Sequence, residues 1–194
     1  MRLGAVVLAA GSGARMGGVA KALLRGTADC GLRTAGRTFL ETIVETARCE
    51  EIVVVVGPPY GDAVAAHAKG LGARVVVNPE PERGMASSIA IGFGALDDSD
   101  AAWLWPVDHP DVAADTLRAL VAALGVHDAA RPVVSGRGGH PPLVARTLWP
   151  RLAGCAELAG GARAVLAAAD VIDVAVTDTG CVRDVDTRAD LEAR

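Results

Sequence analysis

The sequence predicts an α/β fold, built as a single domain over residues 1–194 with a mostly parallel central sheet and helices on both faces. Short apolar runs rich in β-branched residues alternate along the chain with segments of helical periodicity. These runs are continuous rather than interrupted by polar residues, which is typical of parallel strands buried on both faces. Apolar residues make up 51% of the 194 residues, so a large core is possible.

The first strand is expected over residues 3–9, an apolar run that stops at a glycine-rich stretch. A helix is expected over residues 41–48, where apolar side chains recur at helical spacing. The β-branched run 52–56 predicts a second strand, because Gly57-Pro58-Pro59 ends it. The alternation continues with helices over residues 62–69, 85–96, 117–124, 143–152 and 162–169, and strands over residues 74–77, 101–107, 131–134 and 171–176. Residues 25–37 are polar and glycine-rich and predict an exposed loop.

The composition argues against several classes of partner. The formal net charge is −4 and aromatic residues make up 3%, so neither a broad basic face nor a stacking platform for nucleic acid is expected. Cys30, Cys49, Cys155 and Cys181 form no CxxC pair and have no zinc-finger spacing, which favours separate reduced thiols in a cytoplasmic protein. No stretch approaches the roughly 20 apolar residues of a membrane span, so no membrane association is expected.

Residues 8–21, LAAGSGARMGGVAK, predict a local phosphate site. Backbone N–H groups in a glycine-rich loop bind phosphate, and Arg15 and Lys21 supply positive charge beside them. The stretch fits neither standard motif. Met16 stands where a dinucleotide fingerprint needs its third glycine, and Val19-Ala20 follow Gly18 where a P-loop needs Lys-Ser/Thr.

The same stretch resembles the first signature of the MobA-like NTP transferases, which have a nucleotide-diphospho-sugar transferase-like, Rossmann-like fold. The resemblance implies that the glycine loop holds the β- and γ-phosphates together with Arg15. It implies that Lys21 stabilises charge on the α-phosphate, so Arg15 and Lys21 are the expected catalytic residues. The nucleotide-binding residues that it implies here are Leu8, Ala9, Ala10, Gly11, Gly13 and Lys21.

Later segments extend the resemblance over nearly the whole chain. NPEPERGMASSI, residues 78–89, is similar to a family segment beside the nucleotide and adds Asn78 and Ser88, with Gly57 a further candidate after the second strand. PVDHPDV places Asp108 at the carboxyl end of a strand, where a hard cation binds, although a turn explains it as well. RDVDTRADL resembles the family's final segment, which implies that Asp186 completes a Mg²⁺ site; a helix-start carboxylate is the alternative.

Two segments bear on the acceptor. GRGGHPPLV resembles the G-H-P segment of the molybdenum cofactor cytidylyltransferase branch, which implies that His140 contacts the acceptor; a structural histidine is the alternative. LAGGAR, residues 158–163, resembles a G-D-x-G-A-R segment on the acceptor side and keeps Arg163, but it lacks the aspartate.

The resemblance implies a Mg²⁺-dependent nucleotidyltransferase that uses a nucleoside triphosphate and a small phosphorylated acceptor and releases pyrophosphate. Ala10 favours CTP, because the branch that uses guanosine reads L-A-G-G at this point. The expected acceptor is molybdopterin bearing molybdenum, with a molybdoenzyme or chaperone as a possible partner. Sugar or alditol phosphates are the alternative acceptors. A non-catalytic nucleotide-binding regulator is a further alternative. Such a protein would lose the metal-binding carboxylates, so the presence of both Asp108 and Asp186 argues against it.

Overall fold

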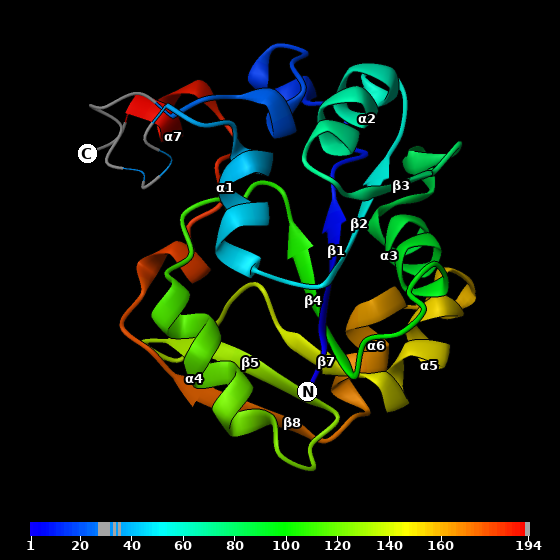
Figure 1. Ribbon diagram of the computed structural model, residues 1–194, viewed down its shortest axis with the longest axis vertical. Coiled ribbons are helices and arrows are strands. Elements are labelled where there is room, and N and C mark those ends of the chain that lie inside the picture. The colour runs from blue at the N-terminus through cyan, green and yellow to red at the C-terminus, as the bar shows by residue number, and fades with distance from the viewer. Residues whose placement is uncertain (27–31, 33, 35, 193–194) are drawn as a thin grey trace.

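The computed structural model describes residues 1–26, 32, 34 and 36–192, and it confirms the predicted α/β fold (Figure 1). In this part of the chain an eight-stranded sheet has the order β3-β2-β1-β4-β7-β5-β6, with β8 beside β5. The strands are β1 (Leu3–Leu8), β2 (Glu51–Val56), β3 (Arg74–Val77), β4 (Ala101–Pro106), β5 (Ala129–Val134), β6 (Arg137–Gly138), β7 (Leu143–Ala145) and β8 (Val171–Ala175).

The parallel part of the sheet places the carboxyl ends of four neighbouring strands at one edge. β1 lies parallel to both β2 and β4, and Leu8 pairs with Val55 on one side and with Pro106 on the other. β3 extends this parallel group beyond β2, and β8 runs parallel to β5. β7 is antiparallel to both β4 and β5 and joins the two parallel groups. The loops that follow β1 and β4 therefore meet at the same edge.

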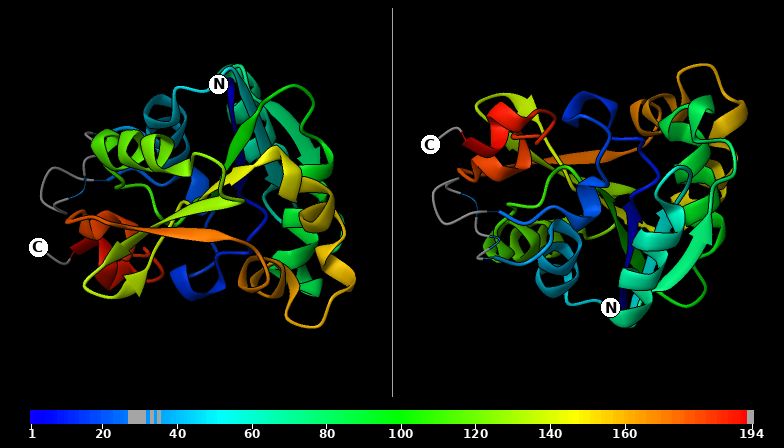
Figure 2. Two further views of the ribbon diagram at one scale, coloured as in Figure 1. Left: turned by 90° about the horizontal axis from the view of Figure 1, so that it is seen from below. Right: turned by 90° about the horizontal axis from the view of Figure 1, so that it is seen from above.

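Helices cover both faces of the sheet, as Figure 2 shows. Side chains of α1 (Phe39–Ala47), α2 (Gly61–Gly70) and α4 (Ala114–Leu124) pack into one buried apolar cluster. Side chains of α3 (Met85–Gly94), α5 (Trp149–Ala153) and α6 (Gly161–Ala167) pack into the cluster on the opposite face. The short helix α7 (Arg188–Glu192) lies near the end of the chain. The sheet is therefore the middle layer of three.

Local sequence explains how two of these helices are placed. α1 begins with a capping box, in which the Thr38 side chain accepts from the backbone of Glu41 and the Glu41 side chain accepts from that of Thr38. α3 lies close to β1 because Gly92 has no side chain: a Cβ at this position would lie 2.3 Å from Val6 Cγ1. This close approach brings the start of α3 beside the loop after β1.

The prediction of one helix over residues 143–152 is wrong. Leu143–Ala145 form strand β7, a 3₁₀ turn follows at Arg146–Leu148, and only Trp149–Ala153 are α-helical. Leu143 and Val144 are fully buried in the sheet, and periodicity does not separate a short buried strand from a buried helix. β6 was not predicted either. The other predicted elements are confirmed, with ends shifted by three residues or fewer.

Part of the predicted loop over residues 25–37 lies outside the described residues, namely 27–31, 33 and 35, and Cys30 is among them. The expectation of exposure is wrong for Leu32 and Thr34, which are both buried. Cys49 and Cys155 are free thiols. Within the described ranges, no helix reaches the combination of length and hydropathy that crossing a bilayer requires.

Candidate active site

A cavity of about 310 Å³ opens at the carboxyl edge of β1 and β4. The loop after β1, the loop after β4, the start of α3 and the segment before α7 all contribute to its wall. Of the predicted site residues, the cavity lining includes Leu8, Ala9, Ala10, Gly11, Gly13, Lys21, Ser88, Asp108 and Asp186. Segments far apart in the sequence thus converge where a parallel sheet is expected to bind ligands.

The glycine-rich loop folds back on itself after β1. The carbonyl of Gly13 accepts backbone hydrogen bonds from Met16 (2.9 Å) and Gly18 (3.0 Å). Gly13 has a φ of +60°, and a Cβ there would lie 1.9 Å from the carbonyl oxygen of Val19, so this position requires glycine. A Cβ at Gly11 would meet no described atom within 4 Å. The backbone of Gly11 is therefore open to a ligand in the cavity.

Tyr60 fixes the far end of this loop, and sequence reasoning did not identify it. Its hydroxyl donates a hydrogen bond to the carbonyl of Gly18, 42 residues earlier in the chain. Arg15 lies in the 3₁₀ turn Ala14–Met16 within the same loop. Other lining residues that the sequence did not indicate are Ser12, Ala14, Ala22, Pro81, Met85, Pro106 and Val107. Most of them are immediate sequence neighbours of predicted residues, and this proximity is the sequence signal that could have identified them.

Lys21 lies between the two predicted metal-ligating carboxylates. Its ammonium nitrogen Nζ is 3.5 Å from Asp108 Oδ2 and forms a closer ion pair with Asp186 Oδ1. Asp108 follows β4, and its backbone carbonyl accepts a hydrogen bond from Val185 (2.8 Å). The backbone N–H of Asp186 donates to the Asp190 side chain (3.0 Å). Asp186 is thus positioned from both sides, by the loop after β4 and by the start of α7.

The two carboxylates fit a divalent cation. Asp108 Oδ1 is buried and has no hydrogen-bond partner among the described residues, so it is an acceptor that a cation would satisfy. The described residues contain no group of three or more His, Cys, Asp or Glu side chains that is suited to hold a metal. Mg²⁺ is commonly held by one or two carboxylates, with substrate phosphates and water as the other ligands. The donor set here matches that arrangement.

Asn78 supports the site from behind the cavity wall. Its buried side-chain amide donates to Ser87 Oγ (2.8 Å) and Ser88 Oγ (2.9 Å), and its carbonyl oxygen accepts from the backbone of Glu80 (3.0 Å). Ser88 lines the cavity, whereas Asn78 does not. Asn78 therefore orients the first turn of α3.

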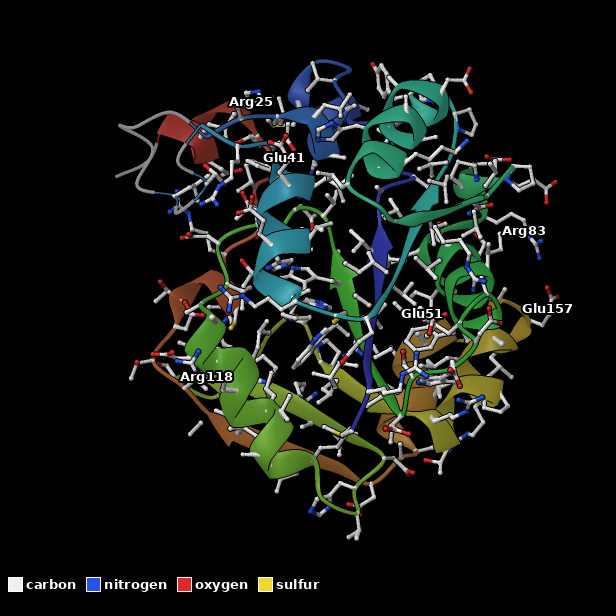
Figure 3. The ribbon with its side chains drawn as sticks, viewed as in Figure 1. Arg25, Glu41, Glu51, Arg83, Arg118 and Glu157 are labelled. Atoms are coloured by element: carbon white, nitrogen blue, oxygen red, sulfur yellow. The ribbon has the colours of Figure 1, made fainter. Side chains whose placement is uncertain are left out.

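A second hollow, of about 290 Å³, lies on the other side of Asn78. The ion pair between Arg83 and Glu157 (2.9 Å), whose side chains Figure 3 shows pointing toward one another, lies at this hollow. It joins the segment before α3 to the segment after α5.

Gly57 and Ala10 lie against each other at the ends of β2 and β1. A Cβ at Gly57 would lie 3.1 Å from the Ala10 methyl and 2.8 Å from the carbonyl oxygen of Asn78. Ala10 is 4% exposed, so its methyl group packs against Gly57 and little of it faces the open cavity. Gly57 itself is outside the described cavity lining. Gly57 thus offers no side chain to a ligand, whereas Ala10 lines the cavity with little exposed area.

The two predicted acceptor residues lie outside the described cavity lining. The His140 ring lies against His109, with ring centroids 4.9 Å apart, and its backbone N–H donates to the carbonyl of Cys181 (2.8 Å). Burial, with the neighbouring His109, lowers the pKa of His140 to about 4, so its ring is neutral at pH 7. Arg163 is exposed on α6. His140 thus contacts His109, and His109 directly follows Asp108 in the sequence. His140 is connected to the cavity by this contact.

A glycine-rich loop, a lysine and a carboxylate pair around one cavity are the features expected of a nucleotide-binding site in an α/β protein. The sequence pattern of the MobA-like NTP transferase domain matches residues 5–173. The chain therefore belongs to the MobA-like NTP transferase family, and the expectation of a nucleotidyltransferase is confirmed at this level. The chain is also 33% identical, over 199 aligned residues, to nicotine blue oxidoreductase of Paenarthrobacter nicotinovorans, covering 94% of this chain and 91% of that protein.

Solved structures agree with the fold. A homologue of Mycobacterium tuberculosis Rv0371c, from Mycobacterium sp. strain JC1, superposes with a TM-score of 0.74 at 26% identity, covering 99% of this chain and 95% of the other. Rv0371c itself, from M. tuberculosis H37Rv and solved in complex with manganese, superposes with a TM-score of 0.67 at 24% identity, covering 91% and 89%. A chain of the same fold thus binds a divalent metal.

Proposed function

We propose that this protein transfers a nucleotidyl group from a nucleoside triphosphate to a phosphorylated acceptor and releases pyrophosphate, with Mg²⁺ as cofactor. The observation that carries the proposal is the position of Lys21, which lies between Asp108 and Asp186 in the wall of the cavity that also exposes Gly11. Family membership supports transfer from a nucleoside triphosphate in general. The identities of the metal, the base and the acceptor are proposed in addition to what family membership supports.

Each residue has a role that its position supports. The open backbone at Gly11 and the loop through Gly13 bind the β- and γ-phosphates, and Arg15 in the same loop adds positive charge. Lys21 stabilises the charge that develops on the α-phosphate. Asp108 and Asp186 hold Mg²⁺, which when bound supplies charge neutralisation and fixes the geometry of the phosphate oxygens.

The proposed reaction needs no strong general base, because the phosphate of the acceptor is already ionised at neutral pH. Catalysis then consists of alignment and charge stabilisation, for which a preformed loop and fixed charges are sufficient. This agrees with the low pKa of His140, which is about 4 and makes the ring a poor proton acceptor at neutral pH. His140 acts, in this proposal, as a neutral group on the acceptor side, and exposed Arg163 attracts an anionic acceptor.

CTP and molybdenum-bearing molybdopterin are the substrates that we propose. The LAAG sequence of the loop and the GHP sequence at His140 support them. The methyl of Ala10, which lies beside Gly57 and lines the cavity, leaves less room for a purine base than a glycine at this position would. The product would pass to a molybdoenzyme or its chaperone in the cytoplasm. Sugar or alditol phosphates remain the alternative acceptors.

The test is pyrophosphate release from each of the four common triphosphates, with Mg²⁺ and with each class of acceptor in turn. Release with CTP and molybdopterin supports the full proposal, and release with a sugar or alditol phosphate corrects the acceptor. Nucleotide binding without any release points to the regulator. An Asp108→Asn protein is the control for contaminating activity.

The similarity to nicotine blue oxidoreductase favours one further candidate, an oxidoreductase, for which we propose a nicotinamide dinucleotide in the same cavity. A dinucleotide carries a pyrophosphate that the glycine-rich loop would bind as it binds a triphosphate. The loss of absorbance at 340 nm, when the reduced dinucleotide is mixed with the protein and a quinone-like dye, detects this activity. Consumption of the dinucleotide without pyrophosphate release would favour the reductase over the transferase.

A further inference from the structure

The two carboxylates of the site, Asp108 and Asp186, already pair with a positively charged side chain of the same protein. Lys21 Nζ contacts both Asp108 Oδ2 and Asp186 Oδ1, and its side chain is only 16% exposed. The side chains of Asp108 and Asp186 are 25% and 21% exposed, so all three groups lie largely out of water. Partial burial strengthens the ion pairs, since water screens them less than it screens surface pairs.

A free divalent cation meets two obstacles at this site. The ammonium group neutralises one of the two negative charges that would attract the metal. It also occupies the space between the two carboxylate groups, so a metal that bridges them would lie beside a like charge at short range. Two of the carboxylate oxygens, Asp108 Oδ2 and Asp186 Oδ1, already contact the ammonium group, and the buried Asp108 Oδ1 by itself is a weak site for a hard cation.

A triphosphate removes both obstacles. Its phosphates would lie over the open backbone of Gly11, which lines the same cavity as Lys21. Their negative charge attracts the ammonium away from the carboxylates, and their oxygens supply the ligands that two carboxylates lack.

We infer that Lys21 excludes free divalent metal from the pair Asp108 and Asp186, and that the site takes the metal only as its complex with a triphosphate. This inference rests on the proposed function, because the triphosphate is the ligand that moves Lys21. It adds an order to the binding events: the metal enters with the nucleotide and not before it. The protein is thereby specific for a metal–nucleotide complex.

The test measures binding of free Mn²⁺, without any nucleotide, from the electron paramagnetic resonance signal of the unbound ion. Lys21→Met removes the charge and keeps an unbranched side chain of similar length. Lys21→Arg keeps the charge. Lys69→Met makes the same substitution at the other lysine of the chain, which is exposed on α2. Circular dichroism melting shows whether each protein is folded.

Lys21→Met is expected to bind Mn²⁺ at least tenfold more tightly than the wild type, whereas Lys21→Arg and Lys69→Met bind as weakly as the wild type. The tighter binding should disappear when Asp108→Asn is added to Lys21→Met. Equal affinities for wild type and folded Lys21→Met, whether both tight or both weak, would overturn the inference. The proposed function fails by a separate result, the absence of pyrophosphate release by the wild type with every pair of substrates.

A measurement on the wild type alone keeps the inference testable if Lys21→Met does not fold. Acetylation by an activated ester is compared at Lys21 and Lys69 by peptide mass spectrometry, so that Lys69 is an internal reference. Excess Mn²⁺ without nucleotide is expected to leave the ratio unchanged, because the ammonium stays between the carboxylates. A twofold or greater rise in Lys21 acetylation with Mn²⁺ alone would show that the free metal displaces it.

Discussion

The hydroxyl group of Tyr60 donates a hydrogen bond to the backbone carbonyl of Gly18 and so connects the start of α2 to the end of the glycine-rich loop. Tyr60→Phe removes this hydrogen bond and keeps the ring. A net contribution of about 1 kcal/mol is typical of such a bond, which corresponds to a several-fold change in an equilibrium. We expect KM for the triphosphate to rise about three- to tenfold, with a much smaller change in kcat.

The matched measurement for Tyr60→Phe is the affinity of the protein for the triphosphate in the absence of acceptor. It should weaken by the same factor as KM, while the melting temperature changes by only a few degrees. An unchanged affinity would show that the loop keeps its conformation without the tyrosine hydroxyl.

Asp108→Asn is expected to reduce Mg²⁺-dependent pyrophosphate release by at least 10²-fold. The amide keeps the shape of the carboxylate but loses the charge that binds a hard cation. Asp186 still pairs with Lys21, so the fold should persist, as a melting curve would show. Asp115→Asn, on the exposed start of α4, is the control for loss of one negative charge. Full activity of Asp108→Asn at ordinary Mg²⁺ concentrations would remove Asp108 from the metal site.

Gly92→Ala is expected to destabilise the protein by about 1–3 kcal/mol, although alanine is the better helix former. The added Cβ would lie 2.3 Å from Val6 Cγ1 and 3.0 Å from Val55 Cγ2, so α3 must move away from β1 and β2. Gly94→Ala on the same helix is the control, because its Cβ would meet no described atom within 4 Å. Urea unfolding of both variants gives the comparison, and opposite signs of the change in unfolding free energy are the expected result.

His140 should make the stability of the fold depend on pH. Burial and the neighbouring His109 lower the pKa of His140 from 6.5 to about 4, against the opposing effect of the nearby carboxylates Asp108 and Asp184. Between these two pH values the unfolded chain binds the proton and the folded chain does not. The stabilisation is therefore complete above pH 6.5, and about 2–3 kcal/mol of it is lost as the pH falls to 4.

The contribution of His140 can be separated from that of the carboxylates that also titrate in acid. Urea unfolding of the wild type and of His140→Gln is followed from pH 7.5 to pH 4. As the pH falls, the unfolding free energy of the wild type should decrease relative to that of the variant. A difference that stays constant over this range would mean that His140 titrates alike in the folded and unfolded chains.

The parallel part of the sheet could be predicted from the sequence because each of its strands is a largely apolar run that ends at or near glycine, proline or asparagine. The region around β7 could not. Leu143 and Val144 are apolar and buried like residues of a core helix, and their strand pairing with β4 and β5 is decided by contacts far away in the sequence. Local propensity therefore gave the wrong structure at this point.

The residues of the candidate site also fall into two groups, those that could be predicted from the sequence and those that could not. Residues that carry a local signal, such as Gly13, Lys21 and Asp108, were predicted and lie together at the cavity. Tyr60 carries no such signal, because its role is a single hydrogen bond to a carbonyl group that any residue possesses. The contact between Gly57 and the methyl of Ala10 carries no such signal either, because it depends on how β1 and β2 end side by side.

The ion pair between Lys21 and Asp186 joins residues 165 positions apart, so a growing chain is able to form it only after Asp186 has left the ribosome. The glycine-rich loop and the β1–β2 pair leave the ribosome long before Asp186 does. A chain released early, before Asp186 is added, would retain the loop but leave Lys21 with Asp108 alone. A copy that stops before Asp186 would therefore lack a finished site.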